Sequence, residues 1–221
     1  MRNKNRTLYF ALCLLGAFAI WTLMVSFADV RAIGPEGSTV GLASFNEAFR
    51  DLFGVHMLLY MLTDWLSLIP VAFVISFGML GLVQWIKRKK ITLVDKSILM
   101  LGGFYAVTIA VFVFFEAVPV NFRPVLIEGV LEASYPSSTT LLVLCVMPTT
   151  IIQLSNRIQN KILNIIVTTV LAAFTVFMVM ARMISGVHWI TDIIGGALLG
   201  GGLVAFYKFS IESGLSTRSK I

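Results

Sequence analysis

The sequence is poor in charge, cysteine and histidine. Only 13% of its 221 residues are charged, and it has two cysteines and two histidines. Cys13 and Cys145 both lie within apolar runs, where a structural thiol is favoured over a disulfide. So few cysteines and histidines give no spacing typical of a metal site. We therefore expect no metal and no cofactor.

Apolar residues are in excess. They make up 58% of the chain, and the mean hydropathy of +0.92 lies outside the range of soluble domains. A helix of about 20 apolar residues spans a bilayer. The sequence therefore predicts an all-α polytopic membrane protein with a single domain, residues 1–221. The expected spans are residues 8–28, 65–86, 97–117, 138–155, 162–181 and 187–208.

Basic residues set the expected orientation. They precede the first span, separate the second from the third and the fourth from the fifth, and follow the last: Arg2, Lys4, Arg6, Lys87, Arg88, Lys89, Lys90, Lys96, Arg157, Lys161, Lys208, Arg218 and Lys220. By the positive-inside rule, these segments and both termini are cytoplasmic. Arg31, Arg50, Arg123 and Arg182 remain for the outer face. Topology accounts for the net charge of +6, so nucleic-acid binding is not expected.

The first outer loop, residues 29–64, has a helical pattern of its own. From Phe45 to Leu62, apolar and aromatic residues recur at steps of three and four. This period predicts an interfacial helix before the second span. His56 falls on the same face, where we interpret it as a side chain with its polar tip in water rather than as a site residue.

Arg182, His188 and Asp192 form the pattern Arg-x5-His-x3-Asp in an otherwise apolar region. If the helix begins near residue 187, the histidine and the aspartate share one face, and the carboxylate can orient the imidazole. A turn at Gly186 would bring the arginine to the same place. The alternative is a structural cluster at a helix end. We favour a functional site, because ionisable residues near membrane depth are costly.

The second outer loop, residues 118–137, supplies further candidates. Arg123 lies just beyond the third span, and Pro136, Ser137 and Ser138 open the fourth helix. Unpaired N–H groups and the dipole at a helix start can bind an anion. Alternatively, Ser137 or Ser138 is only an N-cap. The topology places this helix start at the same outer surface as the arginine, histidine and aspartate motif, which favours an anion site.

With these motifs the sequence resembles the type 2 phosphatidic acid phosphatase (PAP2) superfamily, the six-helix lipid phosphate phosphatases, over roughly residues 97–208. The family signature consists of Lys-x6-Arg-Pro, Pro-Ser-Gly-His and Ser-Arg-x5-His-x3-Asp. The matching positions are Arg123-Pro124, in part Pro136-Ser137-Ser138-Thr139, and Arg182, His188 and Asp192.

The resemblance implies a metal-independent phosphoric monoester or diphosphate hydrolase. In the family, the third-motif histidine attacks phosphorus to form a phosphohistidine, the aspartate orients it, and the arginines hold the phosphoryl oxygens. These roles fall to His188, Asp192, Arg123 and Arg182. The resemblance also implies a lipid phosphate substrate held by the start of the fourth helix, and a bacterial plasma membrane with the site facing outside. Undecaprenyl diphosphate, phosphatidylglycerophosphate, phosphatidate and shorter isoprenoid diphosphates all remain candidates.

Three positions depart from the signature. Glu116 stands at the lysine position, Ala181 replaces the serine, and Thr139 replaces the histidine that protonates the leaving oxygen. Losing positioned acid catalysis typically costs about 10²–10⁴-fold in rate. We expect an impaired phosphatase that favours diphosphates, whose phosphate leaving group needs less protonation. Two origins of Thr139 remain open, a natural change and an introduced substitution.

A non-catalytic lipid-phosphate binder or transporter is the alternative function. A transporter would show interrupted helices or polar groups at mid-membrane, whereas the polar residues here gather at one rim. That distribution favours interfacial chemistry or binding over a conduction path.

Overall fold

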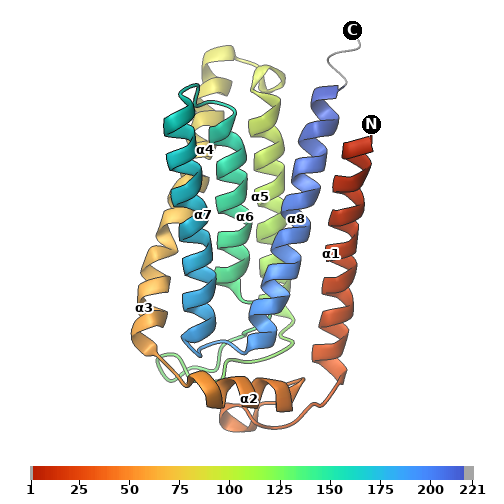
Figure 1. Ribbon diagram of the computed structural model, residues 1–221, viewed down its shortest axis with the longest axis vertical. Helices are drawn as coiled ribbons and strands as arrows, with labels where there is room; N and C mark the ends of the chain where they lie inside the picture. The colour runs from red at the N-terminus through yellow and green to blue at the C-terminus, as the bar shows by residue number, and fades with distance from the viewer. Residues whose placement is uncertain (1, 217–221) are drawn as a thin grey trace.

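The computed structural model describes residues 2–216 and is helical throughout that range apart from turns and isolated β-bridges (Figure 1). This confirms the predicted all-α class. The elements are α1 (Arg2–Phe27), η1 (Pro35–Gly37), α2 (Ala43–Phe53), α3 (Met57–Leu66), α4 (Leu68–Arg88), η2 (Ile91–Leu93), α5 (Lys96–Ala117), α6 (Ser138–Ser155), α7 (Lys161–Ile184) and α8 (Ile190–Ser216).

Six helical segments between residues 2 and 216 are long and apolar enough to cross a membrane, as predicted. They are Asn5–Phe27, Met57–Arg88, Lys96–Ala117, Ser138–Ser155, Lys161–Ile184 and Ile190–Ser213. The start of α1 and the end of α8 lie at the same end of the bundle, opposite α2 (Figure 1). Arg218 and Lys220, which contribute to the expected orientation, lie outside the described residues. Cys13 and Cys145 are both free thiols.

The second span differs from its prediction. It begins at Met57 rather than at residue 65, and α3 continues into α4 after a break at Ser67. The apolar residues before position 65 therefore belong to the bundle and not to the interfacial helix. The cause is Gly54, whose φ of 69° ends α2 and redirects the chain.

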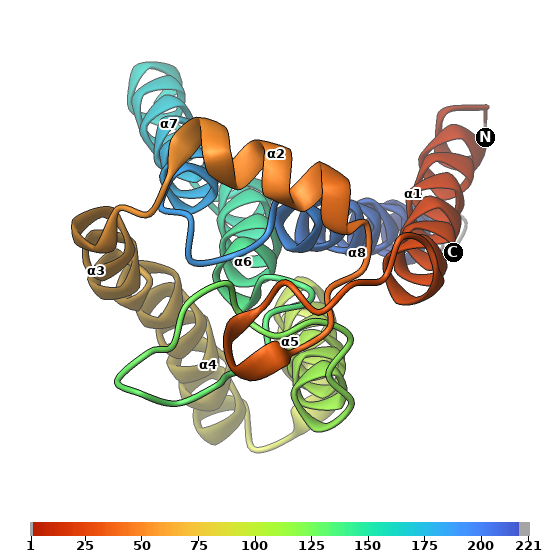
Figure 2. The ribbon, with the colours of Figure 1, turned by 90° about the horizontal axis from the view of Figure 1, so that it is seen from below.

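The interfacial helix is therefore shorter than predicted. α2 ends at Phe53 instead of continuing to Leu62, and it lies across the ends of the bundle (Figure 2). His56 is not on its apolar face. It is exposed at the N-cap of α3, with its ring Nε2 2.7 Å from the Phe53 carbonyl oxygen.

Glycines allow α8 to pack closely against its neighbours. A Cβ atom at Gly196 would meet the Thr140 side chain at 3.1 Å, and one at Gly200 would meet Leu144 Cβ at 3.0 Å. Small residues four positions apart on a helix allow such close approach, and here they bring α8 against α6. α6 and α8 are the most enclosed spans, so the residues at their outer ends are held by protein on most sides.

The close packing of Gly41, in the first outer loop, can be tested by substitution. A Cβ atom at Gly41 would lie 1.5 Å from the Val25 carbonyl oxygen, whereas one at Gly16 would meet no atom within 4 Å. We predict that Gly41→Ala destabilises the fold by about 1–3 kcal/mol through overpacking, while Gly16→Ala does not. Thermal unfolding of both variants in detergent measures the difference. Equal unfolding temperatures would contradict the close approach.

Candidate functional site

A tight turn between α7 and α8 brings Arg182 and His188 toward one place. Gly186 has a φ of 66°, and a Cβ atom there would lie 2.0 Å from the Gly54 carbonyl oxygen. The His56 backbone N–H donates to the Ser185 carbonyl at 2.8 Å. The junction between α2 and α3 thus braces this turn, and the expected role of Gly186 as a turn is confirmed.

The histidine does not lie on α8. The helix begins at Ile190 rather than near residue 187, so His188 and Asp192 do not share a helix face. Their side chains nevertheless approach, with His188 Nδ1 3.7 Å from Asp192 Oδ2. That distance is too long for a hydrogen bond, so direct orientation of the imidazole by the carboxylate was a wrong expectation.

Ser134 fills the gap between these two side chains. Its Oγ is 3.0 Å from His188 Nδ1 and donates a short hydrogen bond to Asp192 Oδ2. Because the hydroxyl proton is directed to the carboxylate, the hydroxyl oxygen accepts from Nδ1–H. The proton of the neutral imidazole is thereby assigned to Nδ1, which leaves the lone pair on Nε2. Ser134 therefore acts as a relay that orients the histidine.

Asp192 is itself held in place by two further donors. Its Oδ2 accepts from the Trp189 backbone N–H at 2.9 Å, and its Oδ1 accepts from Asn121 Nδ2 at 3.4 Å. A second amide, Asn46 of α2, caps the start of α8, where its Oδ1 accepts from the Thr191 backbone N–H at 3.3 Å. Together with Ser134, Trp189 and Asn121 thus fix the aspartate beside the histidine.

His188 has the properties of a nucleophile. Its Nε2 is buried and has no hydrogen-bond partner among residues 2–216. Burial, followed by the charges of Arg123 and Arg182, holds the pKa of His188 well below its ordinary value, and the hydrogen bond with Ser134 opposes this only in part. A neutral imidazole with an available lone pair can attack an electrophile.

The two arginines lie against one aromatic ring. The guanidinium carbon of Arg182 is 4.6 Å from the centroid of the Tyr60 ring, and that of Arg123 is 5.8 Å from it. Arg182 also donates from Nη1 to Thr63 Oγ1 at 3.0 Å and to the Tyr60 carbonyl at 3.3 Å. Both side chains are buried. α3 thus supplies a cation-π platform that draws the two charges together.

Some N–H groups of these arginines remain unpaired within the described part of the chain, namely Arg123 Nη1 and Arg182 Nε. Arg123 Nε lies 2.9 Å from Glu132 Oε2, and Arg182 Nη2 lies 3.8 Å from Asp64 Oδ1. Two like charges buried side by side are costly unless an anion offsets them. This geometry favours an anionic group between the guanidiniums and the histidine.

The start of α6 has a helix cap at Ser137, and only some of its backbone N–H groups remain for binding an anion. Ser137 is the N-cap, and its Oγ accepts from the Thr140 backbone N–H at 3.4 Å. Its own N–H donates to the Asp192 carbonyl at 3.0 Å, so Ser137 has no backbone donor left for a ligand. Pro136 is buried and has no N–H. The N–H groups of Ser138 and Thr139 lie in the first turn, where helix geometry provides no carbonyl partner.

Position 139 faces a cavity of about 290 Å³. The cavity is lined by polar and apolar side chains of α3, α5 and α6, together with the residue between α3 and α4: Asp64, Ser67, Thr108, Ile109, Phe112, Ser138, Thr139, Leu141 and Leu142. Glu116, at the position of the family's lysine, is exposed at the end of α5. It brings no positive charge to the site.

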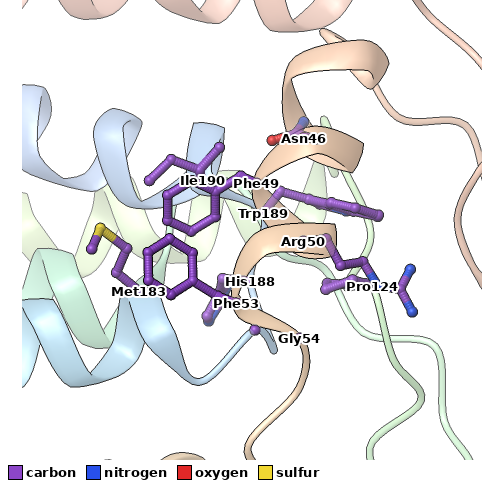
Figure 3. Close-up of a pocket in the computed structure, with 11 residues that line it drawn as sticks. Asn46, Phe49, Arg50, Phe53, Gly54, Pro124, Met183, His188, Trp189 and Ile190 are labelled. Atoms are coloured by element: carbon purple, nitrogen blue, oxygen red, sulfur yellow. The ribbon is translucent and has the colours of Figure 1, made fainter.

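On the side of His188 that α2 covers, there is little free space. Phe49, Arg50 and Phe53 of α2 line a pocket together with His188 and Trp189 (Figure 3). Its volume is only about 10 Å³, which is room for about one water molecule. This pocket is too small for a lipid headgroup, whereas wider cavities lie beside Thr139, with about 290 Å³, and beside Tyr60 and Glu128, with about 420 Å³.

Fold and site together define a helical membrane protein with a buried histidine whose Nε2 is unpaired within residues 2–216 and an arginine pair suited to an anion such as phosphate. Residues 105–212 match the model of the PAP2 superfamily, so this region of the chain is similar to that superfamily. The match agrees with the resemblance seen in the motifs. A search of curated proteins found no match.

One solved structure has a similar fold over nearly the whole chain. It is the crystal structure of a transmembrane PAP2 type phosphatidylglycerolphosphate phosphatase from Bacillus subtilis. The TM-score is 0.57 and the sequence identity 19%, with 93% of this chain and 96% of that chain covered. The similarity supports a common six-span arrangement.

The lowered pKa of His188 has a consequence for stability. As the pH falls through about 6.5, the unfolded chain takes up this proton before the folded protein does. The folded state therefore loses stability below that pH. We predict that replacing the histidine by His188→Asn reduces the drop in unfolding temperature between about pH 8 and about pH 5. Calorimetry in detergent measures it, and an identical drop in both proteins would assign the effect to another group.

Proposed function

We propose that the protein dephosphorylates a lipid phosphate or lipid diphosphate through a phosphohistidine formed on His188. One observation carries this proposal: the unpaired Nε2 of His188 is buried close to two buried arginines that also retain unpaired N–H groups. The match of residues 105–212 to the PAP2 superfamily, and the similar fold of a PAP2 type phosphatidylglycerolphosphate phosphatase, support a phosphate ester as substrate.

In the proposed reaction, Arg123 and Arg182 hold the phosphoryl oxygens, with the N–H groups of Ser138 and Thr139 as further donors. Nε2 of His188 attacks phosphorus in line with the leaving oxygen. Charge stabilisation by the guanidiniums supplies most of the rate and needs no metal. Ser134 and Asp192 stabilise the positive imidazole that forms. Water then hydrolyses the phosphohistidine.

The lipid tail is proposed to lie against the apolar wall of the 290 Å³ cavity, formed by residues such as Phe112 and Leu142. Its headgroup would then reach the arginines at the outer ends of the helices. The positive-inside distribution of basic residues supports an extracytoplasmic site in a bacterial plasma membrane. An enzyme so placed would act on lipids of the outer leaflet.

Thr139 favours a second candidate, a lipid-phosphate binder without catalysis. The anion site is intact, whereas a threonine hydroxyl is a poor proton donor near neutral pH. The two candidates make opposite predictions for turnover. A binder retains a lipid phosphate without releasing inorganic phosphate.

Phosphate release by the purified protein in detergent, with a metal chelator present, tests the proposal. The substrates are a lipid phosphate monoester and an isoprenoid diphosphate, and the proteins are the wild type, His188→Ala and Thr139→His. We expect the wild type to act on the diphosphate in preference to the monoester, and His188→Ala to be inactive. Thr139→His should raise monoester turnover by supplying an acid.

Binding of the same lipids, measured alongside, separates the candidates. Retained binding with no phosphate release by the wild type or by Thr139→His would favour the binder. Equal activity of His188→Ala and the wild type would exclude the phosphohistidine.

The relay through Ser134 gives a further prediction. Ser134→Ala removes the partner of His188 Nδ1, so the imidazole loses its fixed tautomer. We expect kcat to fall by roughly 100-fold or more with little change in KM. Ser26→Ala is a matched control, because that hydroxyl bonds only to a helix carbonyl of α1. An unchanged kcat for Ser134→Ala would remove Ser134 from the mechanism.

A further inference from the structure

The leaving oxygen of the proposed reaction needs a proton, and Thr139 is a poor source. Of the nine residues that line the cavity beside Thr139, Asp64 alone carries an acid or a base. Asp64 comes from α3, in the first half of the second span. The structure thus places one carboxyl in the same cavity as the position where the family has its acid histidine.

Asp64 also lies at the edge of the anion site. Its Oδ1 is 3.8 Å from Arg182 Nη2. The preceding residue, Thr63, bonds Arg182, and Tyr60, one helical turn away, lies under both guanidiniums. A phosphate held by the arginines would therefore have this carboxyl at its cavity side, toward the proposed place of the lipid tail and the leaving oxygen.

An ion pair with Arg182 does not by itself explain why position 64 carries a carboxyl. The hydrogen bonds of the guanidinium go to Thr63 and to the Tyr60 carbonyl, and the 3.8 Å approach to Asp64 is near the limit of an ion pair. The Asp64 side chain is 59% exposed, so solvent or ligand in the cavity can reach it. A carboxyl within a membrane span is costly and points to function.

Other acids near the site are less suitable. Glu132 is engaged with Arg123 at 2.9 Å and does not line the cavity. Glu116 is exposed at the end of α5 and also lies outside the cavity lining. Asp192 is occupied by Ser134, Trp189 and Asn121 beneath the histidine.

We propose that Asp64 donates the proton to the leaving oxygen, in place of the family's histidine. The inference rests on the proposed phosphatase function. As Nε2 of His188 forms the N–P bond, the electrons of the breaking P–O bond move to the leaving oxygen, which takes the proton from the Asp64 carboxyl.

The second half of the reaction restores Asp64. A water molecule attacks the phosphorus of the phosphohistidine, and the Asp64 carboxylate accepts a proton from it. The electrons of the breaking N–P bond return to Nε2. The products are inorganic phosphate and the dephosphorylated lipid, with both His188 and Asp64 in their starting forms.

Substrates with different leaving groups test this role. Asp64→Asn keeps the shape of the side chain and removes the acid. We expect kcat/KM for a lipid phosphate monoester to fall by roughly 100-fold or more. For p-nitrophenyl phosphate, whose leaving group needs no proton, the loss should be at least tenfold smaller. Asp51→Asn, an exposed acid of α2 outside the cavity, is the matched control.

Rescue separates proton donation from positioning. Thr139→His added to Asp64→Asn should restore monoester turnover, and the gain should exceed that of Thr139→His in the wild type. Asp64→Glu, which keeps a carboxyl, should remain active and covers the case in which Asp64→Asn fails to fold.

The contrary results are distinct. An equal loss on both substrates without rescue would show that Asp64 only positions Arg182, and would overturn the inference. So would full monoester activity in Asp64→Asn or an inactive, folded Asp64→Glu. If neither the wild type nor Thr139→His released phosphate from any substrate, the proposed function would fail, and the role of Asp64 with it.

Discussion

The site depends on two buried guanidiniums held side by side. Moving a charge out of water costs several kcal/mol per ion. Cation-π contacts of Arg123 and Arg182 with the ring of Tyr60 offset part of that cost. Thr63 accepts a hydrogen bond from Arg182, and Glu132 forms an ion pair with Arg123. The N–H groups of these arginines that remain unpaired within the described residues favour the binding of an anion. Burial, followed by these two positive charges, lowers the pKa of the neighbouring His188 and keeps it neutral.

The surrounding structure places these two positive charges near the His188 imidazole and fixes the orientation of that ring. Gly186 allows the chain to turn between the arginine and the histidine, and the α2–α3 junction packs directly on that turn. Ser134 then directs the imidazole, and Asp192 anchors Ser134. The pocket beneath α2 is too small for a lipid headgroup, whereas the cavity beside Thr139 is wide enough for part of a lipid. An approach through that cavity would suit a substrate with a long apolar tail.

Local patterns predicted the features that depend on local physics. Hydropathy predicted six spans, and the Arg-x5-His-x3-Asp spacing identified the histidine and its partners because one turn joins them. Features that depend on contacts between distant segments were not predictable from spacing. Ser134 reaches His188 across 54 positions, and Asp64 belongs to a helix whose start was assigned to the wrong element. In the sequence, Gly54 could have indicated this boundary, because it separates the interfacial helix from the second span.

The central claim is that His188 becomes covalently phosphorylated. Rapid acid-free quenching of the protein with a lipid phosphate labelled at phosphorus, followed by peptide mapping, tests it most directly. The account predicts an acid-labile, base-stable label on the peptide that contains His188 in the wild type, and none in His188→Ala. Phosphate release by the wild type without any labelled intermediate, or a label that persists in His188→Ala, would contradict it.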